Sequence, residues 1–255
     1  MKIFAIGNSF SEDGMEYLYP ILQDLGEENI VLKNLAYPGC TVDQHVEFLS
    51  EDKPVYYYRE YINGAWVVRE NQTGLDKFCS DEWDVVTTQQ ASWLSGKSST
   101  YDKVPDLLAI IQKNAKKTPK IKWHMTWAYE GDSVRLTDHD YDGSQLVMYR
   151  GILDAVQQKV LPIGVYDGVI PSGTAVQNAR TSYVGDTLTR DKTHLSIPLG
   201  RYIAALTWAG VLTGKSLQNV RFAPEGVDEQ MKAVAIEAAE NALRSPFEIT
   251  QSIYK

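Results

Sequence analysis

The chain alternates between short apolar runs and longer segments in which apolar residues recur every three or four positions. The short runs have the length and composition of buried strands, and the longer segments have the period of helices that pack on one face. The predicted strands are residues 2–7, 30–36, 83–89, 121–128 and 165–170. Such alternation is typical of an α/β fold, in which helices cover both faces of a parallel sheet.

The predicted helices begin and end at residues that favour helix termini. Asp13 is the expected N-cap of the first helix and Gly26 its stop, and Pro171 suits the first turn of a later one. Gly214 and Pro246 lie beyond the ends of the last two helices. The predicted helices are residues 13–26, 42–49, 101–116, 144–161, a segment from about 171, 195–212 and 228–243.

One segment interrupts this alternation. Residues 55–73 are rich in aromatic and β-branched side chains around Asn63 and Gly64, and an Asn-Gly pair between two such runs predicts a two-residue hairpin turn. We interpret residues 53–78 as a β-hairpin inserted into a three-layer, flavodoxin-like sandwich, within a single domain spanning residues 1–255. Its aromatic side chains either line an active-site rim or pack the hairpin onto the domain, because tyrosine and tryptophan suit both roles.

Composition and charge narrow the classes of partner. No apolar run approaches the roughly 20 residues of a membrane helix, and a net charge of −8 with dispersed lysines and arginines disfavours nucleic acid. The two cysteines, Cys40 and Cys79, lack zinc-site spacing, and we expect reduced thiols. The N-terminus shows no secretory leader. The chain is therefore cytoplasmic as written, or secreted if a leader has been removed, and both remain open.

A candidate nucleophile follows the first strand. Gly7 and Asn8 lead into Ser9, which would present its hydroxyl at the carboxyl end of that strand, where α/β proteins bind ligands. The N–H of Ser9 would lie near a helix N-terminus, whose partial positive charge favours an oxyanion. Taken alone, a serine in this place is more often a helix cap or a turn residue.

A candidate base lies near the other end of the chain. Of the four histidines, only His194 has an aspartate, Asp191, three positions earlier. A serine hydroxyl needs a base that takes its proton, histidine titrates in the useful range, and a carboxylate can orient the imidazole. The alternative is that Asp191 caps a turn and His194 caps the following helix. The presence of Ser9 in the same chain favours a Ser-His-Asp triad.

These segments together resemble the SGNH-hydrolase (GDSL-like) superfamily, and more narrowly a bacterial branch with GNSFS, QQ-S and D-x-x-HLS segments. In that superfamily the nucleophilic serine follows the first strand, and a D-x-x-H motif near the C-terminus completes the triad. The resemblance implies Ser9 as nucleophile, His194 as general base and Asp191 as its orienting partner. It also implies that the N–H groups of Ser9 and Gly39 belong to an oxyanion hole.

The chain departs from the superfamily after the third strand, where the usual G-x-N-D is replaced by Gln89-Gln90-Ala91-Ser92. Glutamine carries the same amide N–H as asparagine on a longer arm. We therefore predict Gln89, or else Gln90, as the third oxyanion donor. Gln90, Trp127 and Tyr129 are also candidate substrate contacts, although core packing is the more frequent role of a residue placed like Trp127.

The expected function is a serine esterase that hydrolyses a small acyl ester, acetyl by resemblance, on a small molecule or glycan. Two alternatives stay open: a non-catalytic carbohydrate-binding protein, motivated by the missing G-x-N-D, and an acyltransferase. No metal or organic cofactor is expected. His124 lies inside a predicted strand and is expected to be structural, and the Asp-rich loop around His139 is expected to be solvated.

Overall fold

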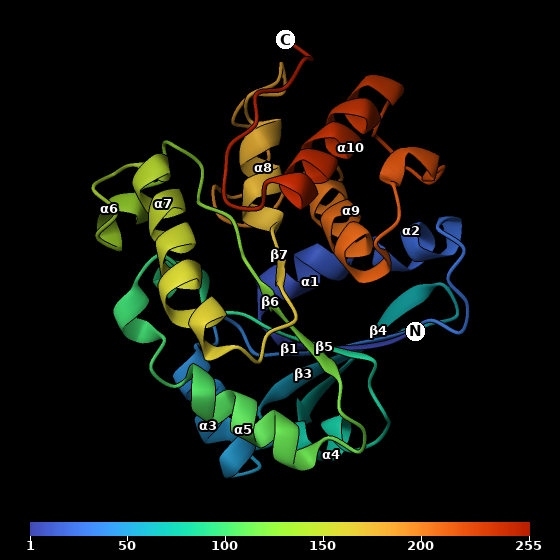
Figure 1. Ribbon diagram of the computed structural model, residues 1–255, viewed down its shortest axis with the longest axis vertical. Coiled ribbons are helices and arrows are strands. Elements are labelled where there is room, and N and C mark those ends of the chain that lie inside the picture. Colours follow the sequence, from blue (N-terminus) through green and yellow to red (C-terminus); the bar gives the residue numbers. More distant parts are fainter.

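A seven-stranded sheet forms the centre of the protein, whose computed structural model describes residues 1–255 (Figure 1). The strands are β1 (Lys2–Gly7), β2 (Val31–Ala36), β3 (Tyr56–Ile62), β4 (Ala65–Gln72), β5 (Val85–Thr88), β6 (Lys120–His124) and β7 (Val169–Ile170). Their order is β4-β3-β2-β1-β5-β6-β7. The five strands in the order β2-β1-β5-β6-β7 pair in parallel, whereas β3 is antiparallel to both of its neighbours, β2 and β4. The parallel part has the flavodoxin-like order, which confirms the predicted fold class.

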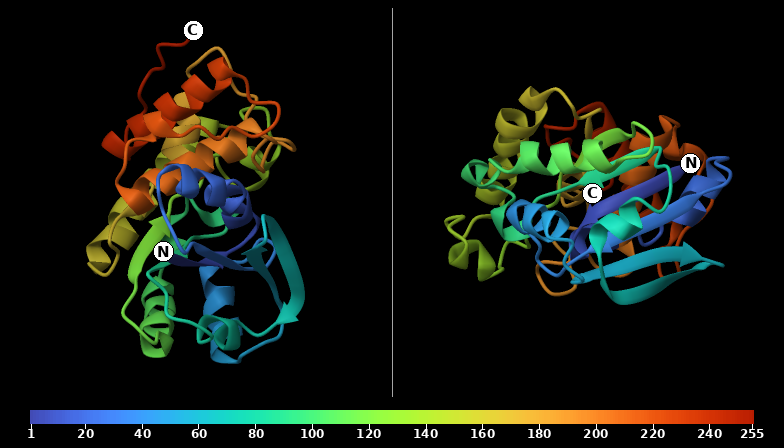
Figure 2. Two further views of the ribbon diagram at one scale, coloured as in Figure 1. Left: turned by 90° about the vertical axis from the view of Figure 1, so that its right-hand side faces the viewer. Right: turned by 90° about the horizontal axis from the view of Figure 1, so that it is seen from below.

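Helices cover both faces of the sheet. They are α1 (Ser9–Met15), α2 (Leu18–Asp24), α3 (Val42–Ser50), α4 (Gly74–Phe78), α5 (Val104–Asn114), α6 (Arg135–Asp138), α7 (Gln145–Ala155), α8 (Ser172–Ala179), α9 (Leu199–Thr213) and α10 (Glu229–Arg244). Figure 2 shows α3, α4 and α5 on one face and α1, α2 and α9 on the other, with α10 packed outside α8 and α9. No helix combines the length and apolar character needed to cross a bilayer.

The first helix begins earlier than predicted and is broken in two. Asn8, not Asp13, is the N-cap, because its side chain accepts a hydrogen bond from Phe10 N (3.0 Å). Asp13 lies inside α1 and is buried. The break before α2 has a local cause: Pro20 has no N–H with which to bond the carbonyl of Glu16.

The other helices follow the predictions with shifted ends. Asp228 caps α10 by accepting from Met231 N (2.8 Å), and Gly214 ends α9 in the left-handed region at φ 66°. The helix predicted over 144–161 stays α-helical only to Ala155 and then continues as a π-helical turn. The strand predicted over 165–170 shrinks to two residues, because only Val169 and Ile170 find partners in β6.

The predicted hairpin forms and extends the sheet through β3, which pairs with β2. Asn63 (φ 50°) and Gly64 (φ 87°) make the turn, and both left-handed residues match a type I′ geometry. The Tyr61 ring stacks on Tyr19 with ring centroids 4.4 Å apart, and Trp66 Nε1 donates to the backbone carbonyl of Glu16. These side chains pack the hairpin onto α1 and α2, the second of the two predicted roles.

Candidate active site

The candidate site lies at the point in the sheet where the strand order reverses. From β1 the chain crosses to β2 on one side, while β5 lies on the other side of β1. Such a switch point leaves a crevice beyond the carboxyl ends of the two strands, which is where ligands bind in open α/β sheets. Ser9 begins α1 directly above β1, and Gln89 follows directly after β5. The topology therefore brings the residues predicted after these two strands to the same edge.

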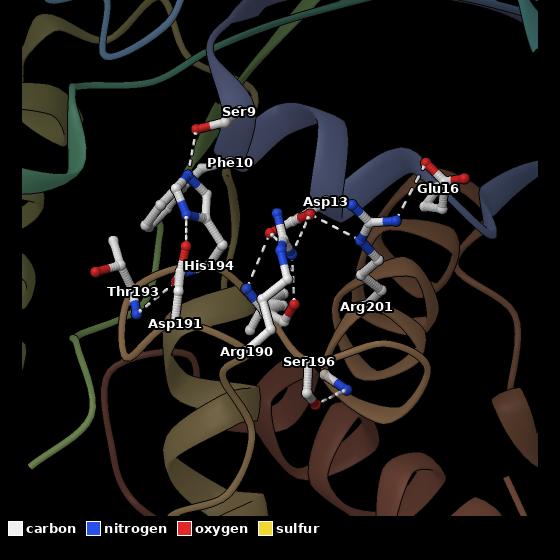
Figure 3. Close-up of polar contacts among 12 residues, drawn as sticks. Ser9, Phe10, Asp13, Glu16, Arg190, Asp191, Thr193, His194, Ser196 and Arg201 are labelled. Atoms are coloured by element: carbon white, nitrogen blue, oxygen red, sulfur yellow. Dashed lines mark hydrogen bonds and ion pairs between the residues drawn. The ribbon is translucent and has the colours of Figure 1, made fainter. Parts of the chain in front are cut away.

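Ser9, His194 and Asp191 form a continuous chain of hydrogen bonds (Figure 3). Ser9 Oγ lies 2.9 Å from His194 Nε2, and His194 Nδ1 lies 2.7 Å from Asp191 Oδ2. Because a carboxylate only accepts hydrogen bonds, Nδ1 carries the proton. The lone pair of Nε2 therefore faces the serine hydroxyl. Ser9 and His194, which are 185 positions apart in the sequence, are therefore in contact.

Asp191 also shapes the loop that carries His194. Its Oδ1 accepts hydrogen bonds from the backbone N–H groups of Thr193 (3.0 Å) and His194 (2.7 Å). Burial on its own raises the pKa of this carboxyl, but the backbone and imidazole hydrogen bonds from His194 outweigh it and hold the pKa below its usual value. Asp191 is thus a turn cap and the imidazole's partner at once. His194 does not cap α9, which begins only at Leu199.

Phe10 and Trp127 support the imidazole from below. The Phe10 ring meets His194 edge-on, with centroids 5.6 Å apart, and Trp127 stacks on the other side of Phe10 at 4.1 Å. Trp127 is fully buried, and its Nε1 donates to the carbonyl of Thr193 (2.8 Å). Tyr129 is buried as well, with its hydroxyl 2.9 Å from Ser92 Oγ. Both predicted substrate contacts are therefore buried, Trp127 against Phe10 and the Thr193 carbonyl and Tyr129 against Ser92.

Gly39 sits in an exposed turn beside Ser9. The turn is tied to the end of β1 because Tyr37 N donates to the Gly7 carbonyl and Asn8 Nδ2 donates to the Cys40 carbonyl (3.2 Å). Glycine suits this position through its backbone angle (φ 63°), since a Cβ added there would meet nothing within 4 Å. No group of the protein accepts a hydrogen bond from the Gly39 N–H. That donor is available to a ligand.

Gln89 is held in a buried polar chain next to the nucleophile. Its Nε2 donates to Asn8 Oδ1 (2.8 Å), and its Oε1 lies 2.8 Å from His124 Nδ1. Burial lowers the pKa of His124 to about 3, so the ring is neutral. Since Oε1 only accepts, His124 carries its proton on Nδ1, and Nε2 accepts from Ser172 Oγ (3.0 Å). The amide of Gln89 is thereby fixed in one orientation, with a second N–H that none of these bonds uses.

The amide of Gln90 is occupied by groups other than the triad and Asn8. Its Oε1 accepts from the backbone N–H groups of Val42 (3.0 Å) and Ala91 (2.8 Å), and its Nε2 donates to the Thr100 carbonyl (2.8 Å). The side chain is buried. Of the two glutamines that sequence alone left as alternatives, only Gln89 lies against the residue that precedes Ser9.

Two residues of the site, Asn8 and His124, contact Gln89 and were not predicted as site residues. Asn8, which precedes Ser9, caps α1 and anchors Gln89; its place before a helix start was the available signal. His124 was expected to be structural, and it is buried as expected, but its contact with Gln89 had no sequence signal. His139 lies beside the ring of Trp93, and no three histidine, cysteine or acidic side chains converge as metal ligands.

Comparison with known proteins agrees with this architecture. A model of DUF4886, a domain of unknown function, matches residues 2–242. The crystal structure of a DUF4886 family protein from Bacteroides uniformis is 36% identical, with 98% of this chain and 97% of that one covered and a TM-score of 0.93. No curated protein matches the chain.

Two more distant structures share the fold. A proposed SGNH hydrolase from Slackia heliotrinireducens is 20% identical, with coverage of 83% of this chain and 98% of that one and a TM-score of 0.53. A member of the lipolytic G-D-S-L family from Veillonella parvula is 16% identical, with coverage of 84% and 97% and a TM-score of 0.50. This protein therefore belongs to the DUF4886 family and has the fold of the SGNH hydrolases.

Proposed function

We propose that this protein is a serine esterase with Ser9 as its nucleophile. The observation that carries the proposal is the unbroken hydrogen-bond chain from Ser9 through His194 to Asp191. A serine that merely capped a helix would need neither the imidazole nor the carboxylate. The non-catalytic alternative, a carbohydrate-binding protein, does not explain why these three side chains are hydrogen-bonded in series. The fold shared with SGNH and G-D-S-L proteins is consistent with the proposal.

In the proposed reaction, Ser9 Oγ attacks the ester carbonyl while His194 Nε2 takes its proton. Asp191 stabilises the imidazolium and keeps the ring in the productive tautomer. His194 then returns the proton to the leaving alcohol, and an acyl-enzyme remains. Water enters by the reverse sequence, with His194 again as base, and releases the acid and free Ser9.

The tetrahedral oxyanion would be held by three donors. The N–H of Ser9 is in the first turn of α1, where no intrahelical acceptor exists. The N–H of Gly39 is unused by the protein. Gln89 supplies the third through the amide hydrogen that does not bond Asn8. Donors fixed in this way act without reorganising during the reaction.

We propose a small acyl group, such as acetyl, on a bulky alcohol such as a carbohydrate. None of the four main surface hollows is lined by Ser9, Asp191 or His194, and a small acyl group needs no large pocket. The side chains of His194 and Asp191 are 26% and 50% exposed, which leaves room for a large leaving group. The same openness would admit an alcohol as acceptor, which is the case for acyl transfer.

Hydrolysis of p-nitrophenyl acetate by the wild type, Ser9→Ala and His194→Ala tests the proposal. We expect turnover by the wild type alone. Absence of wild-type turnover, or activity that survives in both variants, would falsify the esterase assignment. Acetate, butyrate and octanoate esters, followed by acetylated sugars, then rank acyl length and alcohol. Added glycerol or a sugar acceptor separates transfer from hydrolysis through the yield of the new ester.

A further inference from the structure

A buried carboxylate connects the two halves of the candidate triad. Asp13 lies on α1 four residues after Ser9, on the same side of the helix. Its side chain is 1% exposed and is surrounded by donors that are distant in sequence (Figure 3). Arg190 Nη1 lies 3.0 and 3.1 Å from its two oxygens, Arg201 Nε lies 2.8 Å from Oδ1, and Leu195 N donates to Oδ2 (2.9 Å).

These contacts reach the loop on both sides of the triad residues. Arg190 precedes Asp191, and Leu195 follows His194. The base of the loop is closed by the Arg190 N–H, which donates to the His194 carbonyl (2.9 Å), and by Arg190 Nη1, which donates to the Leu195 carbonyl (2.6 Å). Asp13 therefore binds the closed base of the loop to the helix that begins with Ser9.

A buried ion pair is a weak source of stability, because its charges lose their hydration. An apolar contact between α1 and α9 would hold the helices together at least as well. Unlike an apolar contact, a carboxylate makes directional hydrogen bonds. Asp13 Oδ2 holds the backbone N–H of Leu195, directly after His194, and the guanidinium groups of Arg190 and Arg201 hold the carboxylate in place. Arg201, from α9, also lies 3.8 Å from Glu16 on the far side. The arrangement is better explained by a need for geometry than by a need for stability.

We propose that Asp13 is a positioning residue, which holds His194 Nε2 within hydrogen-bond distance of Ser9 Oγ by anchoring the loop base to α1. This inference rests on the proposed esterase function. Asp13 does not touch the reacting atoms, and it acts only through the place of His194. Its loss should therefore lower kcat and leave KM nearly unchanged, because substrate binding does not use it.

Asp13→Asn is the direct test, since it keeps the size of the side chain and removes its charge. Misplacement of a catalytic group by about 1 Å costs on the order of 10²-fold in rate, and we expect a fall in kcat of roughly that size. Asp24→Asn is the matched control. Asp24 accepts hydrogen bonds from the backbone N–H groups of Arg221 and Phe222 and lies 3.4 Å from the Arg221 guanidinium. Asp24 shares with Asp13 the bonds to backbone N–H groups and the arginine partner, and it has no contact with Ser9 or with the loop of His194. Its loss should therefore lower the melting temperature and leave kcat unchanged.

A double variant separates positioning from general damage. In a His194→Ala background, Asp13→Asn should cause no further loss of the residual rate, because nothing is left for Asp13 to position. An additional loss as large as in the wild type would assign Asp13 a purely structural role. The downfield proton resonance of His194 Nδ1–H gives a readout that needs no turnover: it should shift or broaden in Asp13→Asn and stay unchanged in Asp24→Asn.

If Asp13→Asn does not fold, Arg190→Gln takes its place, because Arg190 is partly exposed and the Leu195 N–H bond to Asp13 remains. Its kcat should fall with little change in KM. Wild-type kcat in a folded Asp13→Asn or Arg190→Gln protein, with an unaltered Nδ1–H resonance, overturns the inference and leaves the esterase proposal intact. An inactive wild type overturns the esterase proposal instead.

Discussion

The two sides of the candidate triad are built in different ways. Ser9 stands between a strand and a helix, and its place follows from β1, from the Asn8 cap and from the start of α1. His194 stands in a loop between α8 and α9 whose only regular pairing is a bridge between Thr189 and Leu195. The side of the nucleophile is held mainly by a strand and a helix, whereas the side of the base is held by side chains together with a few backbone hydrogen bonds, such as that from Arg190 N to the His194 carbonyl.

Because of this difference, substitutions on the two sides should affect the local structure differently. Removing the Ser9 hydroxyl leaves β1 and α1 as they are, because no element depends on it. Removing Asp191 frees two backbone N–H groups and the imidazole together. Chemistry and local structure are separable at Ser9 and inseparable at Asp191.

The largest expected effect comes from Ser9→Ala set against Asp191→Ala. Loss of a nucleophilic serine lowers kcat by about 10⁶-fold, and loss of the aspartate by about 10⁴-fold. Ser9→Ala should melt like the wild type, because alanine suits a helix. Asp191→Ala should lose about 1 kcal/mol of stability, because the turn hydrogen bonds disappear. Steady-state kinetics and thermal melts measure both quantities.

The control for this pair is Asp132→Ala, since Asp132 is an exposed carboxylate on the neighbouring segment that pairs only with Lys192. Asp132→Ala should leave both kcat and the melting temperature close to those of the wild type, because an exposed ion pair contributes little to stability. If Ser9→Ala destabilised the fold as strongly as Asp191→Ala, the two sides would not differ in the way described.

The next largest effect separates the two glutamines on the nucleophile side. Gln89→Met removes the amide that lies beside Asn8, and loss of one oxyanion donor costs about 10²–10³-fold in kcat. Gln90→Met breaks bonds to Val42 and Thr100, neither of which bonds Ser9. It should lower the melting temperature while kcat changes less than about threefold, well short of the loss of a donor.

Kinetics of both variants, each compared at equal folded fraction, decide the assignment. Equal losses of kcat in the two variants would mean that Gln89 supports the fold only, and that the oxyanion hole has no more than the N–H donors of Ser9 and Gly39.

The features that could be predicted from the sequence follow the same contrast between local and distant contacts. Ser9 and its strand, the Asn-Gly hairpin and the helix predicted to start at residue 228 depend on neighbours within a few positions, and local rules predicted them. Asp13 looked like an N-cap because a carboxylate before an apolar run usually is one. Its true partners, Arg190 and Arg201, lie 177 and 188 positions away, beyond any local pattern.

The choice between Gln89 and Gln90 was open for a related reason. Both follow β5 and have the same chemistry, and only the position of Val42 N, 48 residues away, shows which amide is occupied. The end of the helix predicted at residue 161 was missed because its π-helical turn keeps the apolar spacing of a helix. Sequence patterns record which face is buried, and they do not record which polar atoms meet across the fold.

A smaller effect appears when the pH is lowered. Burial lowers the pKa of His124 to about 3, whereas an unfolded histidine titrates near 6.5. Between these values the unfolded chain binds a proton that the folded chain does not, so stability falls as the pH falls through this window. Each such histidine contributes a slope of about 1.4 kcal/mol per pH unit. Urea unfolding at pH 4, 5 and 6 measures the slope.

His124→Gln tests the origin of that slope, because glutamine keeps a donor toward Gln89 and does not titrate. In the variant, the slope of stability against pH should be smaller by about 1.4 kcal/mol per pH unit. His45, whose pKa burial also lowers to about 3, contributes to the slope that remains. Asp191 contributes to the pH dependence at lower pH. Because its pKa is lowered in the folded protein, its contribution to stability is lost only as the pH falls below the usual pKa of an aspartate. An unchanged slope in the variant would place the pH sensitivity elsewhere.

The smallest expected effect lies in the loop itself, at Lys192, whose φ of +66° is a left-handed conformation. Glycine adopts this angle freely, but it also gains freedom in the unfolded chain and gives up the exposed pair with Asp132. These terms oppose each other, so Lys192→Gly should change stability by less than about 1 kcal/mol. Lys192→Val, which loses the same pair and strains a β-branched side chain at positive φ, should be destabilised by about 1–3 kcal/mol. If the valine variant were as stable and as active as the glycine one, the Asp191 turn would not require a left-handed residue, and the loop would be held by Asp13 and its arginines alone.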